Sequence, residues 1–275
     1  MTTEQEVASH YTHGSLQQKI FDALKQMGKD PERLAASDLS AADELHTGWR
    51  AMTVEIAKDL GLQRGMTMLD VGSGIGGPAR YFAEAHGCQV TGIDLTEEFV
   101  QVAGELTRRC GLSDLVSFRQ GSALDLPVSS GAFDAATLIH VGMNIEHKAK
   151  LFQNVRRVVK PGGQFCVYDL MRVEAGDIPY PMPWAVTNET SFVETPDTYR
   201  RRLAVAGFKI EREENRRELV LKLAREMQEK IATRGAPPLS QQVLLGPVLR
   251  DRLSNLMGAL GRGTLAPIEM IARAV

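Results

Sequence analysis

Short apolar runs of strand length alternate along this chain with segments whose apolar residues recur at helical spacing. The runs occupy 68–71, 89–94, 116–119, 135–141 and 164–170, and two more follow at 208–212 and 266–272. Strands that alternate with helices in this order form βαβ units. The pattern therefore predicts an α/β, Rossmann-like sheet of seven mostly parallel strands with helices on both faces.

Helical segments that a minimal βαβ array does not need flank this core. Residues 1–61 carry two short amphipathic helices and are expected to form an N-terminal lid, before a core at 62–214. Residues 215–262 carry two further amphipathic helices, an insertion before the last strand at 263–275. No linker separates these parts, so 1–275 is interpreted as a single domain.

Composition narrows the class of protein. Of the 275 residues, 43% are hydrophobic and 24% charged, and the net charge of -2 offers no broad basic surface for nucleic acid. No apolar run reaches the roughly 18 residues of a membrane span. The polar N-terminus does not resemble a secretory signal, and three widely spaced cysteines favour reduced thiols. These features predict a cytoplasmic protein without a membrane or nucleic-acid partner.

The most informative stretch lies after the first strand. Gly72, Gly74 and Gly77 satisfy G-x-G-x-x-G, a turn that admits a nucleotide-like ligand to the backbone. A nicotinamide-dependent oxidoreductase shares these glycines, but it leaves Asp70 unexplained, because a carboxylate there repels a pyrophosphate and attracts an amino group. Asp94 follows Gly72 by 22 residues, the spacing at which an acid binds ribose hydroxyls.

The segment 69–74, L-D-V-G-S-G, resembles the first signature of the Rossmann-like (class I) S-adenosylmethionine (SAM)-dependent methyltransferases. Segments 45–50, 72–80, 140–146 and 181–185 resemble the small-molecule branch related to sarcosine and dimethylglycine N-methyltransferases and ubiquinone-type C-methyltransferases. The resemblance implies SAM as cofactor and methyl transfer to the N, O or C atom of a small molecule. The acceptor and the methylated atom stay open.

The spacing and the resemblance together yield a set of candidate site residues. Ser122 stands where many members of the family carry Asp, which weakens the expected recognition of adenine. The expected cofactor residues are Asp70, Gly72, Ser73, Gly74, Asp94, Leu95, Ser122, Ala123 and Arg50. The expected substrate residues are Tyr11 on the lid, His46, Met143, Asn144 and Trp184.

His140, at the end of the fourth strand, is the candidate catalytic residue, since a neutral imidazole can accept a proton from the acceptor. No metal site is expected. A SAM-binding protein without catalysis stays the third alternative. The helices of 215–262 are expected to cap the acceptor pocket, with Leu223 and Met227 facing it; the alternative is that they form a homodimer interface.

Overall fold

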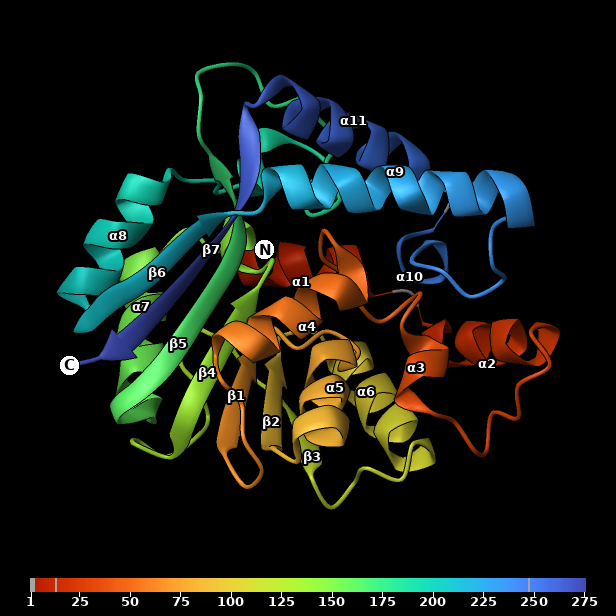
Figure 1. Cartoon of the computed structure of the whole chain (residues 1–275), viewed down its shortest axis with the longest axis horizontal. Helices are drawn as coiled ribbons and strands as arrows, with labels where there is room; N and C mark the ends of the chain where they lie inside the picture. Colours follow the sequence, from red (N-terminus) through yellow and green to blue (C-terminus); the bar gives the residue numbers. More distant parts are fainter. Residues whose placement is uncertain (1–2, 13, 247) are drawn as a thin grey trace.

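A single seven-stranded sheet runs through the protein (Figure 1). The computed structural model describes residues 3–12, 14–246 and 248–275. The strand order is β3-β2-β1-β4-β5-β7-β6, and only β7 runs antiparallel to its neighbours. The predicted fold class is therefore confirmed. The strands are β1 (Thr67–Val71), β2 (Gln89–Asp94), β3 (Val116–Gln120), β4 (Phe133–Ile139), β5 (Val159–Arg172), β6 (Phe208–Asn215) and β7 (Leu265–Ala274).

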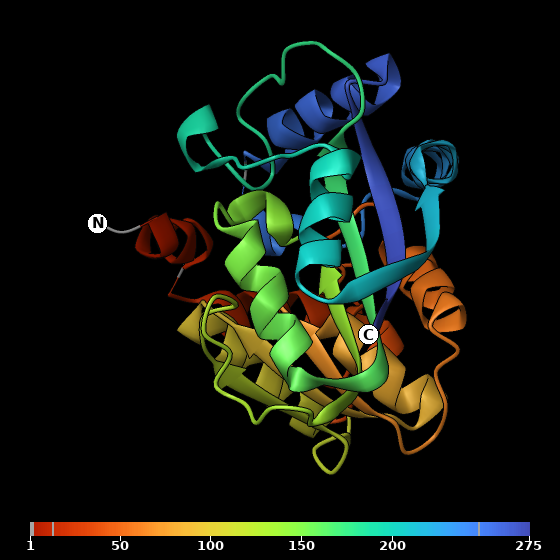
Figure 2. The ribbon, with the colours of Figure 1, turned by 90° about the vertical axis from the view of Figure 1, so that its left-hand side faces the viewer.

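Helices cover both faces of the sheet, as Figure 2 shows edge-on. Alternate strand residues point to opposite faces, and each face buries its own apolar cluster. One cluster packs under α4 (Trp49–Asp59), α5 (Gly77–His86), α9 (Arg217–Arg234) and α11 (Leu249–Arg262). The other packs under α7 (Lys148–Val158) and α8 (Pro196–Val205).

A third apolar cluster joins the N-terminal region to the helices before the last strand. Helix α10 contacts α2, although more than 200 residues separate them. The N-terminal region and the insertion before β7 thus contribute to one side of the molecule. The remaining helices are α1 (Thr3–Tyr11), α2 (Leu16–Gln26), α3 (Ala36–Leu39), α6 (Glu97–Arg109) and α10 (Gln242–Leu245), with short 3-10 turns η1 (Gly142–Asn144) and η2 (Asn188–Thr190).

Strand β4 is shorter at its carboxyl end than the apolar pattern predicts. It ends at Ile139 because His140 adopts a left-handed backbone conformation, with φ at 54°. The next turn, η1, begins at Gly142, where a Cβ atom would lie 2.2 Å from the Asp169 carboxylate. The chain therefore leaves the sheet two residues early and turns across its edge.

Cys88, Cys110 and Cys166 are free thiols. Within the described residues, none of the helices combines the length and the hydropathy that crossing a membrane requires.

The N-terminal segment is fastened to the core by a fully buried ion pair that the apolar pattern does not reveal. Arg80 on α5 donates from Nη2 to Asp43 Oδ2 at 2.8 Å and to the carbonyl of Ile75 at 2.7 Å. Its Nη1 lies 3.1 Å from the Thr107 hydroxyl on α6. Because both partners of the pair are fully buried, removal of Arg80 leaves Asp43 with only the more distant Arg50, 3.9 Å away, as a counter-charge.

We expect Arg80→Met to lower the free energy of unfolding by about 3–5 kcal/mol, since the Asp43 carboxylate would be buried without its partner. Urea titration at neutral pH measures this loss. Arg108→Met is the matched control, because Arg108 lies on the surface and its ion pair with Glu105 is exposed to water. Equal stability of Arg80→Met and the native protein would contradict the role of the pair.

Candidate functional site

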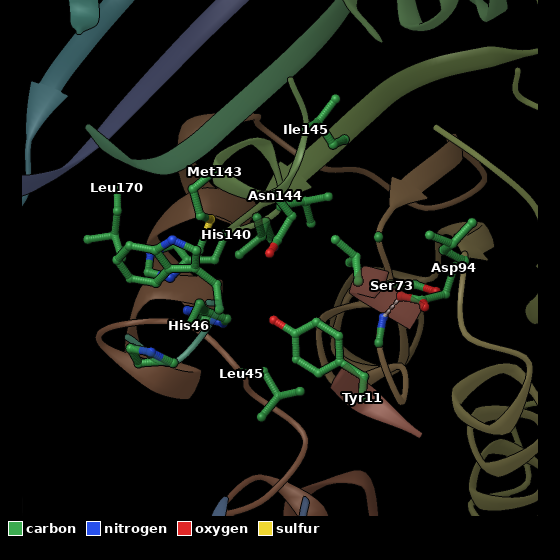
Figure 3. A pocket seen from close by; sticks show the side chains of 18 of the residues that line it. Tyr11, Leu45, His46, Ser73, Asp94, His140, Met143, Asn144, Ile145 and Leu170 are labelled. Carbon is green, nitrogen blue, oxygen red and sulfur yellow. Dashed lines mark hydrogen bonds between the residues drawn. The ribbon is translucent and has the colours of Figure 1, made fainter. Parts of the chain in front are cut away.

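A cavity of about 400 Å³ lies at the carboxyl ends of β1, β2, β4 and β5, the place where open parallel sheets bind ligands. Figure 3 shows its two ends. Ser73 and Asp94 lie at one end, and His46, His140 and Leu170 at the other. The Tyr11 hydroxyl points into the middle, and burial raises the pKa of this phenol to about 12.

The glycine turn follows β1 and wraps closely against its surroundings. Gly72 has φ at 74°, and a Cβ there would lie 2.3 Å from the Val141 side chain. At Gly77 a Cβ would lie 2.2 Å from the carbonyl oxygen of Asp43. Only glycine fits these two positions, so the turn is built around close backbone approach.

Asp94 at the end of β2 holds the same turn in place. Its Oδ2 accepts from the Gly74 N–H at 2.8 Å, and its Oδ1 accepts from the Thr96 N–H at 2.9 Å. Burial nevertheless raises the pKa of this carboxyl group. Each carboxylate oxygen has a second lone pair, so Asp94 retains acceptor capacity towards the cavity that it lines.

Asp70 is the least compensated acid of the site. Its Oδ1 accepts from the Thr137 hydroxyl at 2.8 Å, whereas its Oδ2 has no hydrogen-bond partner among the described residues. Burial raises the pKa of this carboxyl group to about 7. The buried hydroxyl of Ser73 likewise has no partner within the described parts of the chain. This end of the cavity therefore fits a ligand that brings hydrogen-bond donors and positive charge.

At the other end, His140 follows β4 and is held by the neighbouring strand β5. Its backbone N–H donates to the Tyr168 carbonyl at 2.8 Å, and its ring Nε2 lies 3.2 Å from the Thr47 hydroxyl. That hydroxyl lies 2.9 Å from the Tyr168 hydroxyl. Burial and the neighbouring His46 lower the pKa of His140 well below its usual value, so the ring is neutral at physiological pH.

His46 lies beside His140, with the ring centres 6.0 Å apart. Its Nε2 lies 2.8 Å from Glu44 Oε2 and 3.1 Å from the Thr53 hydroxyl. Burial alone would raise the pKa of Glu44, but its bonds to His46 and Thr53 and the charge of Arg50 hold that pKa below the usual value. The pair places a second imidazole, oriented by a carboxylate, at this end of the cavity.

Most of the sequence-predicted site residues meet in this one cavity, but Arg50 and Ser122 are not among those that line it. Arg50 is bonded to Glu44 and lies 4.9 Å over the Tyr81 ring, so its guanidinium charge is already paired within the protein. The Ser122 hydroxyl is bonded to Glu4 of α1. The predicted residues in the lining are Tyr11, His46, Asp70, Gly72, Ser73, Gly74, Asp94, Leu95, Ala123, His140, Met143, Asn144 and Trp184.

The structure also adds residues that the sequence did not single out. Thr47 and Tyr168 join His140 in one hydrogen-bonded group, although 121 residues separate the two. On α9 the residues in the cavity wall are Val220 and Ala224. The expected Leu223 and Met227 are half-buried and are not among the residues that line the cavity. Thr47 lies within the segment 45–50 that carries the family resemblance, and its hydroxyl is the sequence signal for a role in the site.

Within the described residues, the structure holds no group of three or more His, Cys, Asp or Glu side chains arranged for a metal ion.

Comparison with known families agrees with this geometry. Residues 69–167, which run from β1 to β5 and include Asp70, Asp94 and His140, match the family described as "Methyltransferase domain" (Methyltransf_11). The chain contains a methyltransferase domain of the class I, Rossmann-like fold. The family predicted from the glycine turn and Asp70 is thereby confirmed.

The methyltransferase domain resembles a sterol 24-C-methyltransferase, ERG6B of Gibberella zeae, with 37% identity over 122 residues. That match covers 44% of this chain and 32% of the relative. The chain spans between about a third and a half of the length of the curated relatives that it matches.

Solved structures share the fold. A Galdieria sulphuraria protein, described as a sarcosine dimethylglycine methyltransferase, matches with a TM-score of 0.62 at 20% identity, covering 81% of this chain and 82% of that one. The [4+2]-cyclase SpnF also matches with a TM-score of 0.62, at 23% identity over 92% of this chain and 93% of that one. Because a cyclase shares the architecture, the fold alone does not fix the reaction.

Proposed function

We propose that this protein transfers a methyl group from SAM to a small-molecule acceptor. The observation that carries the proposal is the buried Asp70 oxygen, which has no partner among the described residues. SAM carries an α-ammonium group and a sulfonium and has no phosphate, so its charge complements the acids of this end. A pyrophosphate would instead bring negative charge towards Asp70 and Asp94.

The residues of the cofactor end fit the chemical groups of SAM. Asp70 and the Ser73 hydroxyl would receive the methionyl part, next to the glycine turn. Asp94 would accept from the ribose hydroxyls, with Leu95 and Ala123 further along the same wall. When bound, SAM supplies a methyl group on a sulfonium, whose sulfur is a good leaving group because it departs as a neutral thioether.

The chain's own part in catalysis is alignment, exclusion of water and proton transfer. The neutral His140 ring takes up the proton that a hydroxyl or carbon acid of the acceptor loses as the new bond to the methyl group forms. Thr47 and Tyr168 fix the orientation of this ring. His46, Met143, Asn144 and Trp184 would contact the acceptor, and Tyr11 would close the site from α1.

Location and partners follow as part of the same proposal. The three free thiols support a reducing, cytoplasmic environment. The apolar faces of α9 and α11 pack over the cavity, which supports a cap formed by the insertion at 215–262 rather than a homodimer interface.

Two alternatives are separated by binding and transfer assays. A nicotinamide-dependent oxidoreductase would bind NADH, while a SAM-binding protein without catalysis would bind SAM and methylate no acceptor. Incubation with methyl-labelled SAM and a broad panel of acceptors tests the proposed activity directly. Label in an acceptor product supports it, and the absence of any product despite saturating SAM favours the non-catalytic alternative.

We expect Asp94→Ala to weaken SAM binding by about 1.5–3 kcal/mol, because it removes charged hydrogen bonds to the ribose and loosens the Gly74 turn. Asp94→Asn keeps one acceptor oxygen and should lose less. Isothermal titration calorimetry measures both. Asp125→Ala is the control, since Asp125 is exposed and lies outside the cavity lining. Unchanged affinity in a folded Asp94→Ala protein would refute the ribose assignment.

We expect His140→Asn to lower kcat/KM for the acceptor by roughly a hundred-fold or more, while SAM affinity changes only a few-fold. Asn suits this position because it tolerates the left-handed backbone. In the native protein the acid limb of kcat/KM should lie below about pH 6.5, because the pKa of His140 is lowered. His86→Asn on α5 is the control. Lost SAM binding with normal turnover at saturation would make His140 a cofactor residue instead.

A further inference from the structure

The end of the cavity around His140 is walled by one continuous apolar cluster. Its members come from β4, η1, β5, the loop before η2, α9 and α11, and all are buried. Two of these elements belong to the insertion before the last strand. The side chains that form this wall are Ile139, Met143, Leu170, Trp184, Val220 and Leu256.

Charge is distributed unequally along the cavity. Asp70 and Asp94 lie at the cofactor end, and no Lys or Arg occurs among the described residues that line the cavity. Arg252 of α11 lies outside this lining and donates to the Pro183 carbonyl, so an anionic group at the apolar end would lose its hydration without a cation in the cavity wall. It would also enter a site whose buried charges are negative.

A cationic acceptor finds no counterion at the apolar end either. Glu44, the carboxylate beside His46, is buried and already bonded to His46, Thr53 and Arg50. The polar groups that remain include the two imidazoles, the Thr47 hydroxyl and the Asn144 amide, which can exchange hydrogen bonds with a neutral hydroxyl group.

We propose that the methyl acceptor is an uncharged, mainly hydrocarbon molecule that presents a hydroxyl group to His140 and His46. This inference rests on the proposed function, because it assigns the apolar end to the acceptor and the acidic end to SAM. It deepens that function by excluding phosphorylated and carboxylated acceptors, whose charge the site does not compensate.

A pair of probes that differ only in charge tests the acceptor class. Farnesol and farnesyl diphosphate share one hydrocarbon chain, and the protein reports on both through Trp49 and Trp184, its two tryptophans, which line the cavity. We expect fluorescence titration to show farnesol binding at least roughly ten-fold more tightly than the diphosphate, with or without Mg²⁺. Equal affinity, preference for the diphosphate, or no response to farnesol would overturn the proposal.

A charge introduced into the wall should reverse this preference. Met257 on α11 is half-buried and lines the cavity, so Met257→Lys can place an ammonium group in it through a flexible stem. We expect this variant to bind farnesol less tightly and farnesyl diphosphate more tightly. Ser254→Lys adds the same charge to an exposed position of the same helix, outside the lining, and should leave both affinities unchanged.

SAM binding, measured by calorimetry on the same samples, separates this inference from the proposed function. Normal SAM binding with no preference for farnesol would refute the acceptor class alone. Preference for farnesol in a protein that does not bind SAM would refute the proposed function and leave the description of the apolar end intact.

Discussion

Buried negative charge at the carboxyl edge of the sheet is the constraint around which this protein is organised. Asp70 and Asp94 lie at the carboxyl ends of neighbouring strands; Asp70 is buried and Asp94 half-buried, and desolvation raises the pKa of each. Asp94 is partly compensated by N–H groups of the backbone, whereas one oxygen of Asp70 lacks a partner among the described residues. A site of this kind is completed by a ligand that carries positive charge and donors, and SAM meets both requirements.

The segment from Asp43 to Arg50 connects the stability of the fold to the chemistry of the site. Asp43 is paired with Arg80 in the core, and the next residue, Glu44, is bonded to Arg50 and to His46 in the cavity wall. The carbonyl of Asp43 also fills the space that a side chain at Gly77 would occupy. Asp43 and Glu44 therefore pack the N-terminal region against the glycine turn and orient the His46 imidazole.

Local sequence signals predicted the seven strands, the glycine turn and the strand-end acids Asp70 and Asp94, because these depend on residues close together in the chain. Arg50 and Ser122 do not line the cavity because they bond to Glu44 and Glu4 respectively, and these contacts form only in the folded chain. The contact between Thr47 and Tyr168 and the choice of α9 residues that line the cavity also depend on tertiary packing, so the local sequence does not predict them. His140 lies inside the run that the pattern predicted as strand but one residue past the end of β4, because a left-handed turn interrupts the run.

The pH dependence of SAM binding tests the central claim most directly. The free Asp70 carboxyl has a pKa of about 7 and must ionise to pair with the ammonium group of SAM, which stays mostly protonated up to about pH 7.5. Calorimetry should therefore show SAM affinity rising roughly five-fold between about pH 6 and about pH 7.5 in the native protein, with proton release. Asp70→Asn should bind more weakly and without this rise. Tight binding of NADH, or a SAM affinity that Asp70→Asn leaves unchanged at every pH, would contradict the account.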